Sequence, residues 1–118
     1  MRKQRFAIIP TACLLAVSLL LFGPRHVRAG SGTPPTVTVE IHNFAFQPAN
    51  VTVHQGDTVE WKNEDGVAHT ATATTPKPGF DSGSIQPGGT WHYKAQAKGT
   101  YNYICTIHPY MKGTLIVQ

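Results

Sequence analysis

Short segments that alternate apolar and polar residues constrain the fold of this chain more than any other feature. A period of two places every second side chain on the buried face of an extended strand. Breakers rich in Gly, Pro, Asn and Asp separate these segments, and no segment keeps a helical period; the alternation centres on residues 37–41, 51–53, 59–61, 91–93, 101–103 and 115–117. The pattern predicts an all-β sandwich of two antiparallel sheets with about seven to eight strands.

The inward positions of these strands define the expected hydrophobic core. They are Val37, Val39, Ile41, Phe44, Phe46, Val51, Val53, Val59, Trp61, Trp91, Tyr93, Tyr101, Tyr103, Leu115 and Val117. A domain of this size buries only about 60% of its unfolded surface, so its core is small.

The first 29 residues have the three parts of a secretory signal peptide. Arg2, Lys3 and Arg5 precede an apolar run over 6–22, and the small residues Val27 and Ala29 lie where signal peptidase cleaves. We therefore expect a signal peptide over 1–29, a flexible leader over 30–35 and one domain over 36–118. The protein would be periplasmic or otherwise exported, without stable membrane insertion after cleavage. An uncleaved membrane anchor is the alternative, although the apolar run is short for a bilayer of about 30 Å.

The positive charge of the chain belongs mainly to this first segment. The formal net charge is +4, yet all four arginines and Lys3 precede Gly30. The remainder has five lysines and six acidic residues, a net charge of −1. This charge excludes a nucleic-acid binder, which needs a basic surface for the phosphate backbone.

Cysteine usage points to a metal. Once Cys13 is removed with the signal peptide, Cys105 is the remaining thiol, so no internal disulfide can form. A lone cysteine in an oxidising compartment indicates a metal ligand or an intermolecular partner. A buried and inert cysteine is the alternative.

A short segment near the C terminus combines three metal-binding side chains. Cys105, His108 and Met111 are spaced three residues apart, and Pro109 disfavours a helix through them, so we expect a loop. Two histidines, a cysteine and a weak axial methionine form the ligand set of a mononuclear electron-transfer copper. The candidate for the missing ligand is His69, which follows the turn at 63–66; His42, His54 and His92 are expected on the surface.

Motifs along most of the chain resemble the cupredoxins, the type 1 or blue copper proteins, and especially their amicyanin and plastocyanin-like members. These motifs are Phe44-x-Phe46-x-Pro48, Gly56-Asp57-Thr58-Val59-x-Trp61-x-Asn63, Asp65-x-x-x-His69, Phe80-Asp81-Ser82-Gly83, Gly99-Thr100-Tyr101-x-Tyr103-x-Cys105 and His108-Pro109-x-Met111-x-Gly113. The resemblance implies a Greek-key β-sandwich and one type 1 copper ion, Cu(I)/Cu(II). It also implies equatorial ligands His69, Cys105 and His108 and an axial Met111.

Two residues depart from the family pattern. Thr70 replaces an Asn that often follows the upstream ligand, which changes any bracing between the two ligand loops. Ile107 stands where amicyanin-like loops often have Pro, and its backbone N–H is available to the Cys105 sulfur. On that basis Ile107→Pro would lower the reduction potential.

The resemblance implies a one-electron carrier that docks weakly with redox partner proteins near His108, as a monomer. Pro109 and Tyr110, with Pro76 and Pro78, would supply an apolar rim. An enzyme is not expected, because Ile104 and Thr106 flank Cys105 in place of the histidines that serve further copper centres. Copper delivery from the same site is the main alternative, and a zinc-bound or metal-free adhesion module is another.

Overall fold

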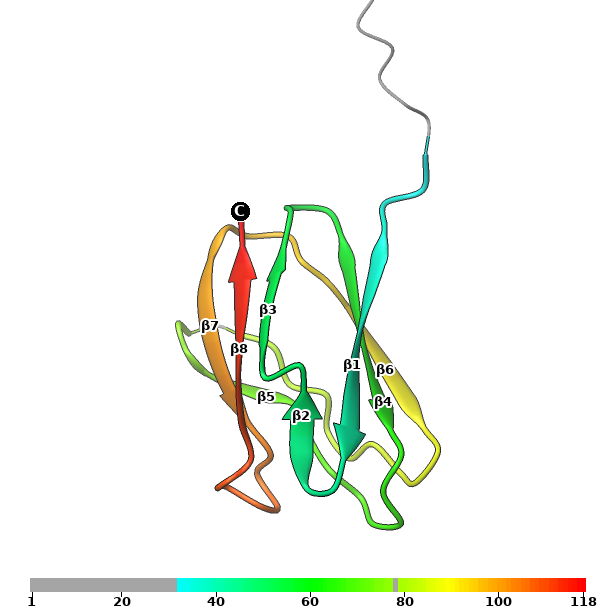
Figure 1. The fold of residues 1–118 in the computed structure, drawn as a ribbon. Helices are drawn as coiled ribbons and strands as arrows, with labels where there is room; N and C mark the ends of the chain where they lie inside the picture. The colour runs from blue at the N-terminus through cyan, green and yellow to red at the C-terminus, as the bar shows by residue number, and fades with distance from the viewer. Residues whose placement is uncertain (1–31, 78) are drawn as a thin grey trace, which may run out of the picture. The chain divides into compact units, whose positions relative to one another are not determined.

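Eight β-strands form the regular structure of residues 32–77 and 79–118, the part of the chain that the computed structural model describes (Figure 1). The strands are β1 (Thr36–His42), β2 (Ala45–Gln47), β3 (Asn50–Val53), β4 (Thr58–Asn63), β5 (Thr72–Thr75), β6 (Thr90–Lys94), β7 (Gly99–Ile104) and β8 (Lys112–Val117). Within these ranges no helix is long and apolar enough to cross a membrane. The predicted signal peptide, 1–29, lies outside the described residues.

The strands form two four-stranded sheets, ordered β2-β1-β4-β6 and β3-β8-β7-β5. The prediction of an all-β sandwich is therefore confirmed, but the prediction of antiparallel sheets is wrong. Strand β1 runs parallel to β4, and β3 runs parallel to β8. The alternation of side chains shows which face of a strand is buried, and it is the same whether the neighbouring strand runs parallel or antiparallel. Connections that pass between the two sheets allow spatial neighbours to run in parallel.

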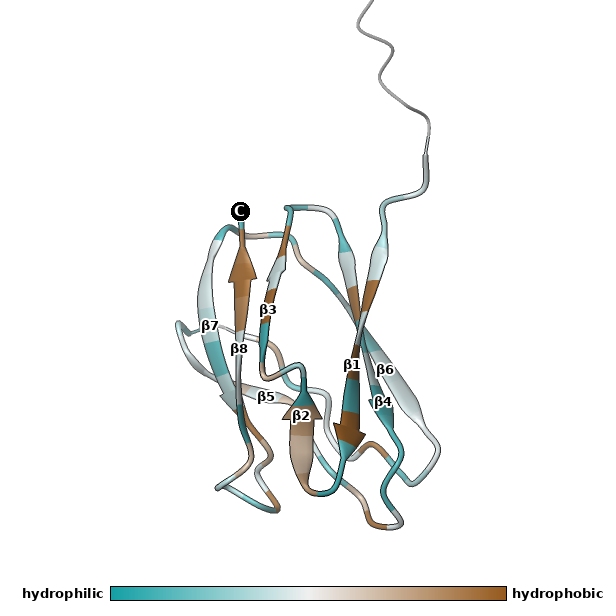
Figure 2. Cartoon of the chain, in the orientation of Figure 1, coloured by the Kyte–Doolittle hydropathy of each residue, from teal (hydrophilic) through white to brown (hydrophobic). Residues whose placement is uncertain are grey.

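The inward positions of the central strands form the core, as the alternation predicts. Val39, Ile41, Val59, Trp61 and Leu115 are fully buried, and Figure 2 shows apolar and polar residues following one another along the strands. The expected core positions Val37, Trp91 and Tyr93 are only partly buried. The core also takes in residues from connections that show no period, namely Ala71, Phe80, Ile85, Ala95, Cys105 and Met111.

Phe44 is a correction to the predicted core. Its side chain is 42% exposed, and its backbone is left-handed with a φ of 57°. The residue lies in the two-residue turn between β1 and β2, where the reversal of the chain removes it from the strand alternation. A prediction from the alternation alone therefore places Phe44 in the core, whereas its side chain is partly exposed.

An aromatic cluster fills the centre of the sandwich. Tyr103 packs edge-on against Trp61 and Phe46, with ring centroids 5.6 and 4.8 Å apart. Gly113 faces Tyr103 across the β7–β8 pair, and a Cβ atom built on Gly113 would overlap the tyrosine ring. Burial raises the pKa of Tyr103 to about 12, so the ring stays neutral at physiological pH.

Replacement of Gly113 by alanine is expected to destabilise the metal-free protein by about 1–3 kcal/mol, because the new Cβ atom would push the Tyr103 ring out of its packing against Trp61 and Phe46. Gly66→Ala is the matched control, since nothing lies within 4 Å of a Cβ built there. Urea unfolding of both variants measures the difference. Equal midpoints for the two variants would contradict this account of the β7–β8 packing.

Candidate metal centre

Three connections meet at the end of the sandwich opposite the C terminus (Figure 1). The β4–β5 connection contains His69, the β7–β8 connection contains Cys105 and His108, and the β1–β2 turn contains Asn43 and Phe44. Segments about 20 to 60 residues apart in sequence thus meet at one site. We call these connections the metal end.

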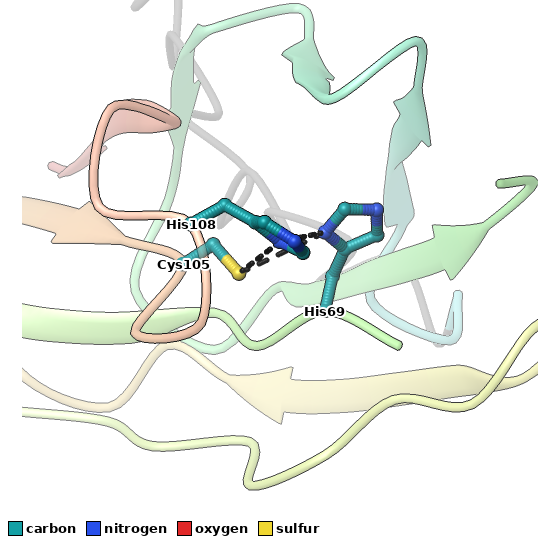
Figure 3. Close-up of side chains that lie close together, drawn as sticks. All are labelled: His69, Cys105 and His108. Atoms are coloured by element: carbon teal, nitrogen blue, oxygen red, sulfur yellow. Dashed lines mark hydrogen bonds between the residues drawn. The ribbon is translucent and has the colours of Figure 1, made fainter. Parts of the chain in front are cut away.

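The donor atoms of His69, Cys105 and His108 face one another (Figure 3). Cys105 Sγ lies 3.7 Å from His69 Nδ1 and 3.6 Å from His108 Nδ1, and the two nitrogens are 3.2 Å apart. The structure therefore brings these three sequence-predicted residues together as one triangle of soft sulfur and borderline nitrogen donors.

The ligand loop is closed by its own backbone. Met111 N–H donates to the carbonyl oxygen of His108 at 2.9 Å, and Cys105 N–H donates to the carbonyl oxygen of Met111 at 3.1 Å. His69 and Cys105 are fully buried and Met111 is 2% exposed, while His108 is partly exposed. Met111 thus lies in the core with its backbone bonded to Cys105 and His108, and His108 is the member of the group that reaches solvent.

The position of His69 depends on a polar turn that follows β4. The buried Asn63 amide donates to the carbonyl oxygens of Val67 and Ile85 at 2.8 and 2.9 Å, and its Oδ1 accepts Asp65 N–H at 3.0 Å. The His69 backbone then forms two hydrogen bonds with Ile85. These bonds hold the turn and the ligand backbone in one conformation.

Asp65 sets the orientation of the His69 ring. Its Oδ2 lies 2.9 Å from His69 Nε2. A carboxylate only accepts, so Nε2 donates to it, and in the neutral imidazole the unprotonated nitrogen is then Nδ1, which faces the other donors. A metal-binding histidine commonly donates its second N–H to a carboxylate in this way. Sequence reasoning placed Asp65 in a motif without assigning it this role; a carboxylate four residues before a ligand histidine is the available signal.

The same carboxylate accepts two backbone bonds from the β1–β2 turn. Asn43 N–H donates to Asp65 Oδ1 at 2.8 Å, and Phe44 N–H donates to Asp65 Oδ2 at 2.9 Å. Burial opposes ionisation of this carboxyl, but the bonds from Phe44 and Asn43 and the contact with His69 outweigh burial and hold the pKa of Asp65 below its ordinary value.

Thr70 joins the two ligand loops. Its backbone N–H donates to Cys105 Sγ at 3.3 Å, and its hydroxyl oxygen accepts Thr106 N–H at 2.8 Å. The Thr70 and Thr106 hydroxyls are also 3.0 Å apart. The departure from Asn at this position therefore leaves a bracing contact between the loops, made by a hydroxyl.

The expected bond from Ile107 to the sulfur is not formed. Within the described ranges, the backbone N–H that donates to Cys105 Sγ belongs to Thr70, and Ile107 has a side chain that is 51% exposed. In the closed loop, the Cys105 sulfur contacts the β4–β5 connection at Thr70. The expected drop in potential on Ile107→Pro therefore loses its physical reason.

The remaining histidines of the described chain lie on the surface, as expected. Each of them lies near a carboxylate. The distances are 2.8 Å from His92 Nε2 to Glu60 Oε2, 3.7 Å from His54 Nδ1 to Asp57 Oδ2, and 3.9 Å from His42 Nδ1 to Asp65 Oδ1. All three histidines are exposed. None joins the His69, Cys105 and His108 cluster.

A buried thiol and two imidazoles at the end of an eight-stranded sandwich define a mononuclear metal-binding β-sandwich protein. The family model of the cupredoxin-like domain matches residues 11–117. The chain belongs to the cupredoxin-like family.

The chain is similar to amicyanins and plastocyanins over about two thirds of its length. Amicyanin-alpha of Methylorubrum extorquens is 33% identical over 84 residues, with 68% of this chain and 70% of the relative covered. Plastocyanin of Scenedesmus fuscus is 32% identical, with 64% of this chain and 88% of the relative covered.

Solved structures agree with the fold. A Cu(I) form of an amicyanin variant superposes with a TM-score of 0.66 and 26% identity, covering 70% of this chain and 82% of that chain. A copper-containing nitrite reductase from Thermus scotoductus has the same TM-score and 31% identity, over 70% of this chain. The chain spans only 22% of that reductase chain.

The Asp65 carboxylate is expected to stabilise the metal-free protein in a pH-dependent manner. Asp65→Asn should cost about 1–2 kcal/mol at neutral pH, because hydrogen bonds to a charged acceptor are lost. A folded pKa below the unfolded value of about 3.9 means that the contribution is present above that value and disappears as the pH falls through the folded pKa. The difference in the free energy of unfolding between the wild type and Asp65→Asn should therefore narrow in acid.

Urea unfolding at pH values from 7 to 3 measures this gap. Glu64→Gln is the control, because Glu64 pairs with the exposed Lys62 and is expected to contribute within about 0.5 kcal/mol. A gap between wild type and Asp65→Asn that stays constant down to pH 3 would refute the proposed role of the charge.

Proposed function

We propose that this protein is an exported one-electron carrier that holds one type 1 copper ion with His69, Cys105, His108 and Met111. The observation that carries the proposal is the triangle formed by the two Nδ1 atoms and Cys105 Sγ. One copper ion is the cofactor, and it supplies reversible exchange between Cu(II) and Cu(I).

The dimensions of the triangle fit a first-row metal. Sides of 3.2, 3.6 and 3.7 Å give a circumradius of about 2 Å, close to usual metal distances of about 2.0–2.1 Å to imidazole and about 2.3 Å to thiolate. Met111 supplies the weak fourth ligand from the closed loop. The Asp65 and Thr70 contacts hold the donors in place without a metal, so little needs to move when the ion gains or loses an electron.

The relatives support an electron carrier in preference to an enzyme. The similarity to amicyanin and plastocyanin implies an electron carrier, and one solved amicyanin variant is in the Cu(I) form. The nitrite reductase contains this kind of domain as about a fifth of its length. Among the described residues the His and Cys side chains form one metal cluster, and Ile104 and Thr106 flank the cysteine.

Copper delivery is not favoured by the burial of the site. His69 and Cys105 are fully buried and Met111 is nearly so, and the loop that contains two of these residues is closed by backbone bonds. Transfer of the ion to a partner would require the core to open, whereas transfer of an electron leaves every contact in place.

The domain organisation follows from the sequence pattern. Residues 1–29 are the signal peptide, 30–35 the leader and 36–118 the cupredoxin domain, and the mature protein is periplasmic or otherwise exported. The start of β1 at Thr36 supports the domain boundary.

The docking surface lies at the metal end. The large apolar side chains that are exposed within the described ranges are Phe44, Val67, Ile107 and Tyr110, and all four belong to its three connections. His108 reaches solvent among them, with its ring centroid 5.1 Å from Phe44 and 6.2 Å from Tyr110. A small apolar patch around a partly exposed ligand suits brief contacts between a monomer and its redox partners.

Addition of Cu(II) to the pure metal-free protein is expected to produce an intense blue colour, because the site combines a thiolate with two imidazoles. Cys105→Ala should remain colourless under the same conditions. The visible spectrum and copper content measure the result. A wild-type protein that binds zinc tightly and stays colourless with copper would exclude the electron-carrier function.

Electron self-exchange between Cu(I) and Cu(II) copies tests the docking surface without a named partner. Tyr110→Lys should slow self-exchange by about tenfold or more at low salt, since two like charges would meet when two apolar patches approach. Its visible spectrum should match that of the wild type.

Thr100→Lys is the matched control for self-exchange. It adds the same charge to an exposed position near the start of β7, whereas the ligand loop follows the end of that strand. If both variants slow self-exchange equally, net charge explains the effect and the metal end is not the contact surface.

A further inference from the structure

We propose that Phe44 is a positioning residue for the metal site, whose ring holds both ligand imidazoles in their metal-binding orientation. This inference rests on the proposed copper function. It assigns a purpose to a side chain that is neither a ligand nor part of the core.

The backbone at Phe44 adopts a conformation that phenylalanine disfavours. Asn43 and Phe44 have φ angles of 50° and 57°, and they form the two-residue turn between the paired residues His42 and Ala45. Turns with two positive φ angles prefer Asn followed by Gly. The left-handed conformation of a residue with a Cβ atom disfavours folding by roughly five- to thirty-fold.

The Asp65 carboxylate holds the turn in this conformation. Each of its oxygens accepts one backbone N–H of the turn, at 2.8 Å from Asn43 and 2.9 Å from Phe44. Oδ2 also contacts His69 Nε2 at 2.9 Å. The position of the Phe44 backbone is thereby tied to that of a ligand.

The ring of Phe44 meets both ligand imidazoles nearly at right angles. Its centroid lies 5.3 Å from that of His69 with an interplanar angle of 86°, and 5.1 Å from that of His108 with an angle of 89°. These values match the edge-to-face arrangement that aromatic pairs prefer. Rotation of either imidazole about its Cβ–Cγ bond would change the interplanar angle and weaken this contact.

The contact matters more for His108 than for His69. The ring of His69 is also held through Nε2 by Asp65, and its backbone is bonded to Ile85. The side-chain hydrogen-bonding contacts of His108 within the described residues are those of Nδ1, with the other two members of the triangle. Phe44 is therefore a principal restraint on the orientation of the His108 ring, and 42% exposure leaves it little value as a core residue.

Two substitutions separate the effect of the Phe44 ring from the effect of the strained backbone. Phe44→Leu removes the ring and keeps a Cβ atom in the left-handed turn, while Phe44→Gly removes both. In the metal-free protein, the imidazole NMR resonances of His108 should broaden or double in both variants, and those of His69 should change less. The folding equilibrium constant should be at least about fivefold higher for Phe44→Gly than for Phe44→Leu.

Copper affinity, measured by competition with a chelator, should fall about two- to tenfold in both variants, the change that corresponds to one edge-to-face contact. Val67→Ala is the matched control, because Val67 is also 42% exposed and lies at the same end. It should leave affinity and the His108 resonances unchanged.

Phe44→Leu and Phe44→Gly proteins with His108 resonances and copper affinity equal to those of Val67→Ala would overturn the proposal. A wild-type protein that fails to bind copper would instead overturn the proposed function. The NMR comparison of the metal-free variants tests Phe44 in either case, so the two failures are distinguishable.

Discussion

The metal end depends on the carboxylate of Asp65, which joins the β1–β2 turn to the β4–β5 connection. It accepts the two backbone N–H groups of the strained β1–β2 turn and contacts the Nε2 atom of His69. One ionised side chain therefore sets the tautomer of a ligand and the backbone of the turn that places Phe44. Because the group is largely shielded from solvent, each bond is stronger than a similar bond in water.

Around this carboxylate, the site is held by contacts that need no metal. Backbone bonds close the loop from Cys105 to Met111, and Thr70 links that loop to the β4–β5 connection through the sulfur and a hydroxyl. The aromatic packing of Tyr103 on Gly113 holds β7 and β8 together directly behind the loop. A preformed arrangement of donors keeps structural change small when an electron arrives or leaves, which is the requirement of an electron carrier.

Much of the fold follows from local pattern, and the exceptions have identifiable causes. The alternation in β1, β4, β7 and β8 predicts their buried faces, because a period of two has one meaning wherever a strand borders a core. Strand direction was not predictable in this way, which is why the parallel β1–β4 and β3–β8 pairs were missed. Phe44 was misassigned because a reversing turn ends the alternation, and Ile85 and Phe80 enter the core from irregular connections.

The sequence by itself determined the sandwich class and the chemical identity of the donors, since residue types and their spacing in one loop suffice for both. It also indicated His69 as the distant member of the cluster, which the structure brings to the other two. Only the tertiary structure decided how these donors are oriented. Apart from the local contact between Asp65 and His69, the contacts that orient them join residues about 20 to 60 positions apart. These are the bonds from the β1–β2 turn to Asp65, the contact between Thr70 and Thr106, and the packing of the Phe44 ring on His108. Such contacts depend on how the sheets bring their connections together, which no local pattern contains.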